Sequence, residues 1–207
     1  MNGRPIFGRV CSAIAFMMIG AGAVTLLPDD GPSPDPPRAA AAGAVDIGFS
    51  QDMVAHHQQA VTMAQAVRGR TSPPVARLAI AIELNQIKEI GQMQGWLALW
   101  NAPQVPSGPP MTWMSTSHHG HTRRADGVMP GMASQQEIDR LGEANDRDVE
   151  MWFLRLMIRH HEGGLTMATA AARHAEHPQV RALATLMIAE QRKEISVMAG
   201  LLAALGR

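Results

Sequence analysis

Residues 53–64 read MVAHHQQAVTMA and residues 157–168 read MIRHHEGGLTMA, so nearly the same stretch occurs twice in one chain. Each copy contains a methionine, a pair of histidines and a second methionine in the same spacing. The repeat continues beyond this stretch, because QIKEIGQM at 86–93 corresponds to QRKEISVM at 191–198. The repeated unit is therefore long enough for two helices.

Helical patterns cover residues 46–68, 75–100, 145–174 and 179–205. The breakers GRTSPP (69–74) and HAEHP (174–178) separate the members of each pair, and Ser134 with Glu137 forms a capping-box signature for a short additional helix. No convincing β-alternation is present. Two helix pairs joined by a long connection match the layout of a four-helix bundle. The sequence therefore predicts an all-α fold, built from two duplicated helix pairs joined by a long Met/His-rich loop.

The N-terminal segment indicates export. Arg4 and Arg9 are followed by an uncharged run from Val10 to Leu27, so residues 1–27 are either a cleaved signal peptide or a membrane anchor. Residues 28–44 form a Pro/Ala-rich tether. Residues 45–207 form the helical domain, with a first helix pair (45–100), a connecting loop (101–133) and a second pair (134–207). Both readings place this domain in the cell envelope or outside the cell.

Composition narrows the class of partner. The chain has 18 basic and 18 acidic side chains, a balance that gives no electrostatic footprint for nucleic acid. Its single cysteine, Cys11, permits neither an internal disulfide nor a thiolate-rich metal site. The high methionine count of 15 favours soft-metal binding, although methionine also fills hydrophobic cores. The predicted partner is a metal ion, with membrane contact only through an uncleaved N-terminus and with homo-oligomerisation left open.

The histidine pairs lie on inward-facing helix stripes. At 100° per residue, Phe49, Met53 and Met63 fall within about 60° of His56, and the second copy repeats this arc. Glu89 shares a stripe with core-type residues, and a buried carboxylate needs a cation or several hydrogen bonds. The candidate metal ligands are His56, His57, His160, His161, Met53, Met63, Met157, Met167, Glu89, Glu194, Met93 and Met198. The candidate supporting residues around them are Gln86, Gln191, Asp46 and Glu150.

The connecting loop contains a second candidate metal-binding set, because flexible methionines and histidines can wrap an ion without a prebuilt cavity. Its members are Met111, Met114, His118, His119, His121, Met129 and Met132. Imidazole suits several transition metals, whereas thioether ligands select Cu(I). We therefore expect copper, with Cu(I) favoured, Cu(II) as an alternative and other transition metals less favoured. The alternative interpretations are a purely structural polar network in the interior and a His-rich linker in the loop.

The pattern F-x3-M-x2-HH-x5-MA (49–64 and 153–168), the paired Q-x-K-E-I-x2-M and the MPGM before the third long helix resemble the family called domain of unknown function 305. The resemblance implies a ferritin-like four-helix bundle, often exported, with members linked to copper. It implies that the His–Met stripes are the ligand region. One departure is Gly164, which stands where the family pattern has alanine and weakens the helix locally.

Three functions are compatible with these sequence features. The favoured one is an exported protein that binds, sequesters or handles copper in the cell envelope. A metal-dependent oxidoreductase of ferritin-like type is the enzyme alternative, with Glu89 and Glu194 as metal bridges or base. It is less favoured, because Met53 and Met157 stand where di-iron proteins place glutamate three positions before the histidine. No catalytic residues are therefore assigned. The third function is a metal-free helical scaffold that binds a protein partner.

Overall fold

The computed structural model describes residues 41–116 and 129–206. The N-terminal apolar run, most of the tether and the loop histidines His118, His119 and His121 lie outside these residues. In the described part of the chain, five α-helices and one short 3-10 helix form, and no strand is present. The all-α prediction is therefore confirmed. Every helix within the described ranges is too short or too polar to cross a membrane.

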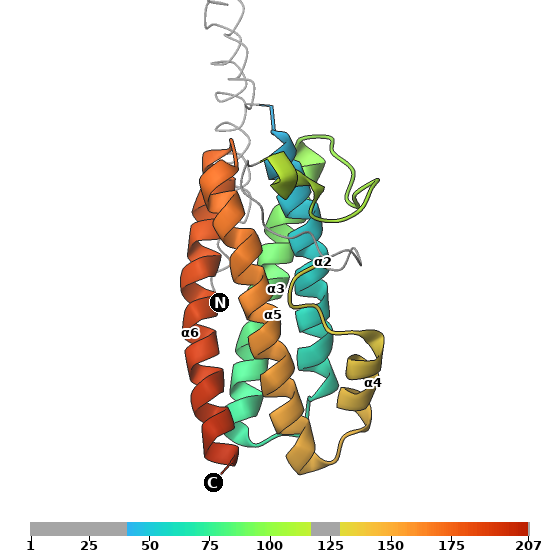
Figure 1. The fold of residues 1–207 in the computed structure, drawn as a ribbon, viewed down its shortest axis with the longest axis vertical. Helices are drawn as coiled ribbons and strands as arrows, with labels where there is room; N and C mark the ends of the chain where they lie inside the picture. Colours follow the sequence, from blue (N-terminus) through green and yellow to red (C-terminus); the bar gives the residue numbers. More distant parts are fainter. Residues whose placement is uncertain (1–40, 117–128, 207) are drawn as a thin grey trace, which may run out of the picture. The chain divides into compact units, whose positions relative to one another are not determined.

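The long helices of the described chain lie side by side (Figure 1). They are α2 (Ala44–Ala66), α3 (Pro73–Leu99), α5 (Asp146–His174) and α6 (Pro178–Leu205). The helix α2 packs along α3, α5 packs along α6, and α2 also contacts α5. The short helix α4 (Gln135–Glu143) packs against α2 and α5, and the 3-10 helix η1 (Thr112–Thr116) contacts α2. The contact between α2 and α5 brings the two copies of the histidine motif to a common interior.

Local sequence explains where the helices begin. Pro73 and Pro178 occupy the first turns of α3 and α6, where proline loses no hydrogen bond. Ser134 and Glu137 form the expected capping box at α4, and the Asn145 side chain accepts from the Asp148 backbone N–H at the start of α5. These local signals determine where the helices begin, and they can be recognised in the sequence.

The two turns between paired helices are held by acidic side chains from the opposite pair. Asp46, near the start of α2, accepts hydrogen bonds from the backbone N–H groups of Gly43 and His177, at 2.8 and 3.0 Å. Glu150, the corresponding residue of α5, accepts from the backbone N–H of Ser72. His177 and Ser72 are the N-cap residues of α6 and α3. Each helix pair thus caps the second helix of the other pair.

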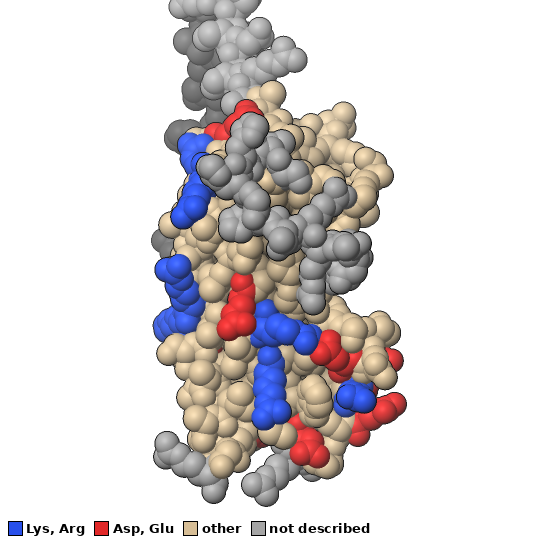
Figure 2. Space-filling view, in the orientation of Figure 1, with Lys and Arg blue, Asp and Glu red and all other residues tan. Residues whose placement is uncertain are grey.

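Hydrophobic side chains form two separate buried clusters. One contains Phe49 and Trp113, whose rings meet edge to face at 5.8 Å between centroids, and the other contains Phe153 and Leu141. The buried histidines and glutamines belong to neither cluster. On the surface, basic and acidic side chains are mixed over the lower part of the face shown in Figure 2.

Candidate metal centre

The four motif histidines meet in the protein interior. His56, His57, His160 and His161 are all buried, with at most 1% of their surface exposed. The imidazole rings of His56 and His160, from α2 and α5, lie 3.8 Å apart between centroids, with their planes tilted by 33°. The structure therefore brings together the corresponding histidines of the two sequence copies, as two facing inward stripes would.

The second histidine of each pair bonds to a glutamate on the neighbouring helix. His57 Nε2 lies 2.7 Å from Glu89 Oε2, and His161 Nε2 lies 2.7 Å from Glu194 Oε2. The two contacts join corresponding residues, α2 to α3 in one pair and α5 to α6 in the other. Both glutamates thus hold a histidine ring in place.

The first histidine of each pair bonds to a backbone carbonyl. His56 Nε2 lies 3.0 Å from Pro130 O, and His160 Nε2 lies 2.9 Å from the carbonyl oxygen of His56. A carbonyl oxygen can only accept, so Nε2 carries the proton in both rings. In a neutral imidazole with a protonated Nε2, the other nitrogen, Nδ1, presents a lone pair.

All four Nδ1 atoms are buried and have no hydrogen-bond partner among the described residues. A buried polar atom without a partner costs about 1–3 kcal/mol, so four related ones call for an explanation. Histidines that ligate a metal through one nitrogen almost always donate the other N–H to a carboxylate or a backbone carbonyl. In these four rings Nε2 contacts an oxygen and Nδ1 has no hydrogen-bond partner among the described residues.

Burial keeps His56, His57 and His160 neutral by lowering their pKa values. Desolvation lowers the pKa of His56 to about 3, with a further decrease from the nearby His57, and it lowers the pKa of His57 to about 3. Desolvation and the charge of His56 hold the pKa of His160 well below 6.5. A ligating histidine must be neutral. These rings are therefore ready to ligate at neutral pH without first losing a proton.

Burial acts in the opposite sense on the carboxyl groups. Desolvation, followed by the negative charge of Glu194, raises the pKa of Glu89 to about 7. Desolvation and the neighbouring Glu89 and Glu194 also raise the pKa of Glu190. In the absence of a cation, the raised pKa values thus keep part of the carboxyl groups protonated. A bound cation would favour the charged carboxylates.

The six motif methionines are fully buried and fall into two groups. The first hydrophobic cluster contains Met53, Met93 and Met167, and the second contains Met63, Met157 and Met198. The members of each group correspond to those of the other group under the sequence repeat. The predicted stripes are thus confirmed as buried, and the thioethers lie in two sets rather than one.

Two glutamines line the same interior. Gln86 and Gln191 are buried, and the Oε1 atom of each has no hydrogen-bond partner among the described residues. A Cβ atom placed on Gly164 would lie 2.6 Å from Gln191 Oε1. The glycine in the second copy therefore makes room for this side chain, a role that the sequence pattern does not reveal.

Asp46 and Glu150 require a correction to the sequence-based prediction. They were expected among the polar residues around the histidines, but their carboxylates bind backbone N–H groups at the two turns. The helical wheel places them on the inward stripe, and it cannot show that their distance along the axis brings them to the helix ends. They support the fold rather than the centre.

Both ends of the Met/His loop are ordered on the helices. The backbone N–H of Met111 and the indole N–H of Trp113 donate to Asp52 Oδ2, at 2.6 and 2.8 Å. Met129 is buried in the first hydrophobic cluster, and Met111, Met114 and Met132 pack against it. The loop methionines thus converge on the cluster that contains Met53, while the second cluster receives none of them.

Asp52 is a residue that the sequence analysis missed. It is 2% exposed, and desolvation raises its pKa. Two signals mark it in the sequence: it lies about 40° from His56 on the helical wheel, and its counterpart in the second copy is Leu156. A carboxylate at a core position of only one copy indicates a contact that the other copy lacks.

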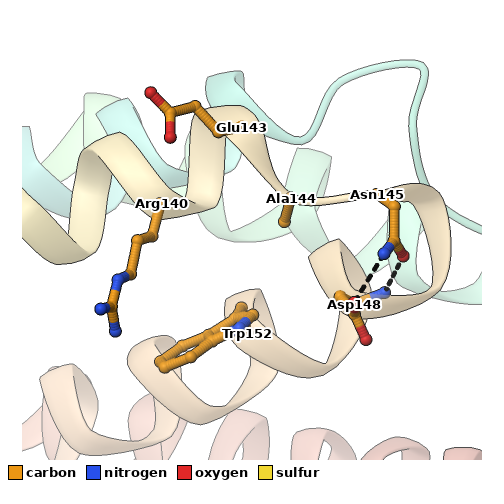
Figure 3. A pocket seen from close by; sticks show the side chains of 6 residues that line it. All are labelled: Arg140, Glu143, Ala144, Asn145, Asp148 and Trp152. Carbon is orange, nitrogen blue, oxygen red and sulfur yellow. Dashed lines mark hydrogen bonds between the residues drawn. The ribbon is translucent and has the colours of Figure 1, made fainter.

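Two further observations limit which residues can form a metal centre and where it can lie. Within residues 41–116 and 129–206, no three His, Cys, Asp or Glu side chains are grouped closely enough to hold a metal ion. A hollow between α4 and α5 lies elsewhere and is lined by Arg140, Glu143, Ala144, Asn145, Asp148 and Trp152 (Figure 3). In that hollow, Asn145 and Asp148 bond to each other, and the motif histidines and methionines do not line it.

Comparison with known proteins identifies relatives of this chain. A protein from Streptomyces coelicolor described as "putative secreted protein DUF305" is 41% identical over 78% of this chain and 92% of its own, with a TM-score of 0.70. A DUF305 fragment from Deinococcus radiodurans is 32% identical over 79% of this chain and 98% of its own, with a TM-score of 0.65.

The copper-binding protein CopM in its Cu(I)-bound form is 26% identical over 77% of this chain and 96% of its own, with a TM-score of 0.59. None of the curated proteins matches this chain. The family model described as "Domain of unknown function (DUF305)" matches residues 46–202, which span both histidine motifs. The chain therefore belongs to the DUF305 family.

Proposed function

We propose that this protein is an exported copper-binding protein that holds Cu(I) in its interior through histidine Nδ1 atoms and methionine thioethers. One observation carries the proposal: four buried Nδ1 atoms lack a hydrogen-bond partner in the part of the chain that the structure describes, while each Nε2 is bonded to an oxygen. Imidazole and thioether together suit Cu(I) better than they suit Zn²⁺ or a hard cation.

The relatives support copper as the cargo. CopM has been solved with Cu(I), with Cu(II) and with silver, at 25–27% identity to this chain. Silver(I) and Cu(I) share a preference for soft ligands, and this chain provides six buried thioethers and four buried imidazoles. By analogy with CopM, we therefore propose that this interior binds a soft monovalent metal ion.

In this proposal Glu89 and Glu194 orient and polarise the histidines rather than bind the metal first. Their Oε2 atoms are already engaged by His57 and His161 Nε2. A carboxylate that accepts from the far nitrogen of a ligating histidine fixes the ring and makes Nδ1 a better donor. This engagement disfavours the oxidoreductase alternative, in which the glutamates would bridge metals.

The proposal extends to the origin and architecture of the fold. We infer a ferritin-like four-helix bundle formed from two copies of one helix pair. The support is that corresponding residues make corresponding contacts, as in His57–Glu89 and His161–Glu194. The caps made by Asp46 and Glu150 follow the same correspondence.

The loop provides the entry for the metal in this proposal. Met111, Met114, Met129 and Met132 contact the first hydrophobic cluster, so thioethers extend from the loop toward Met53 and Met167. The secreted classification of the Streptomyces coelicolor relative and the apolar run at 10–27 support export, where such a loop would meet copper outside the cytoplasm.

The test is an anaerobic Cu(I) titration against a competing chelator. In the Met53→Leu/Met157→Leu variant, a swap that nearly conserves volume, we expect at least about tenfold weaker Cu(I) binding than in the wild type. Met187→Leu is the matched control, because Met187 is buried in the first cluster but its counterpart is Ile82. Absence of Cu(I) binding by the wild type, or equal affinity in both variants, contradicts the proposal.

A further inference from the structure

Residues 129–133 form a strap between α2 and α5. On the α2 side, His56 Nε2 donates to the Pro130 carbonyl at 3.0 Å. The side chain of Gln59 exchanges two hydrogen bonds with the backbone of Ala133, donating at 2.9 Å and accepting at 2.7 Å. Three bonds from residues within one turn of α2 thus hold this segment.

On the α5 side, the strap depends on two glycines. Gly131 has a φ of 79°, in the left-handed region that disfavours residues with a side chain. Gly163 lies beneath the strap, where a Cβ would overlap the Pro130 carbonyl and lie 2.7 Å from the Gly131 nitrogen. Gly163 and Gln59 are corresponding residues of the two copies. One copy thus binds the strap at this position, and the other makes room for it.

His56 differs from the other three motif histidines in what orients it. The acceptors for His57, His160 and His161 are residues of the long helices. The acceptor for His56 is Pro130, which belongs to the strap at the end of the Met/His loop. The orientation of this one ring therefore depends on a segment that belongs to none of the helices.

We propose that the strap sets the metal affinity of His56 and so couples the loop to metal binding in the interior. This inference rests on the proposed function. With the strap closed, the Pro130 carbonyl holds His56 with Nδ1 free to ligate. Metal on Nδ1 makes Nε2–H a stronger donor, so by linkage the metal tightens the strap. Loss of the hydrogen bond between His56 and Pro130 therefore weakens metal binding at His56.

The first test is Gly163→Ala, which displaces the Pro130 carbonyl. We expect about tenfold weaker Cu(I) binding, the size of effect seen when an outer hydrogen-bond partner of a metal ligand is lost. In ¹⁵N-histidine NMR spectra of the metal-free protein, the hydrogen-bonded Nε2–H signal of His56 should be lost while those of His57 and His161 remain. Gly91→Ala is the control, because space around that helical glycine is open.

The second test is hydrogen exchange of the Ala133 amide in the wild type, which should slow when Cu(I) or Ag(I) is bound. Gln59→Ala removes the bonds to Ala133 without touching α5, so it decides the question if Gly163→Ala fails to fold. Wild-type Cu(I) affinity in Gln59→Ala, or metal-independent exchange at Ala133, overturns the inference while leaving the proposed function standing. A wild type that binds neither ion overturns both.

Discussion

The imidazole rings of His56 and His160 lie 3.8 Å apart between centroids, and His160 Nε2 donates to the backbone carbonyl of His56 itself. These residues occupy the same position in the two sequence copies, so the copies meet at their histidines. The reciprocal bond is absent, because His56 donates to Pro130 instead. The contact therefore joins two equivalent rings in unequal environments, and the loop is the cause of the difference.

Acid should destabilise the metal-free protein as the pH falls below about 6.5. Unfolded histidines take up protons near pH 6.5, whereas the pKa values of His56 and His57 are about 3 in the folded protein. Between about pH 6.5 and pH 3 the unfolded state thus binds more protons than the folded state. For each such histidine, the free energy of unfolding falls by about 1.4 kcal/mol for every unit by which the pH decreases.

The raised pKa of Glu89, about 7 against 4.5 when unfolded, works in the opposite sense between these values and offsets one histidine. Because His160 adds a third depressed pKa, stability should still fall from pH 6.5 to 5. Urea unfolding at several pH values measures this. A stability that is flat over this range would contradict the lowered pKa values of His56, His57 and His160.

Copper affinity should follow Glu89 rather than the histidines. The sequence alone suggests proton competition at about pH 6.5, but the pKa values of His56 and His57 are about 3, so these two rings stay neutral far below pH 6.5. Glu89, with a pKa of about 7, carries a proton that a bound cation displaces. Cu(I) affinity should then fall by up to about tenfold per pH unit below pH 7. In Glu89→Gln the dependence should vanish between pH 7.5 and 5, and an unchanged slope would refute this assignment.

Removal of the Asp46 cap should destabilise the fold. Asp46 is fully buried and accepts from both Gly43 and His177, so Asp46→Ala leaves two backbone N–H groups without this acceptor. We expect a loss of about 2 kcal/mol in the free energy of unfolding, measured by chemical denaturation. Asp46→Asn keeps one acceptor oxygen and should lose less. Equal losses in the two variants would show that hydrogen bonding is not the cause.

Asp52 should control the start of the loop. Asp52→Leu installs the residue type found at the corresponding position, Leu156, and removes the acceptor for Met111 and Trp113. The indole N–H resonance of Trp113 should shift, and limited proteolysis should cut faster within residues 111–134. Asp52→Asn retains an acceptor oxygen and serves as the control. An unaltered Trp113 resonance in Asp52→Leu would exclude this anchoring role.

Much of the fold follows from the sequence because its signals are local. Helix periodicity and breakers such as Pro73 predict elements that the structure confirms to within a few residues. The repeat predicts that His56 and His160 face a common interior. The roles of Gln59, Gly163 and Gly164 could not be predicted, because each depends on a neighbour distant in sequence. Asp46 was misplaced because a helical wheel gives direction around the axis but not depth along it.

The central claim is that Cu(I) is held by histidine nitrogen and methionine sulfur together. X-ray absorption of the anaerobically Cu(I)-loaded protein measures this most directly, since scattering from sulfur differs from that of nitrogen or oxygen. The account predicts a mixed first coordination shell of nitrogen and sulfur, with the sulfur contribution reduced in Met53→Leu/Met157→Leu and retained in Met187→Leu. A shell of nitrogen and oxygen alone, or protein that retains no copper, would contradict it.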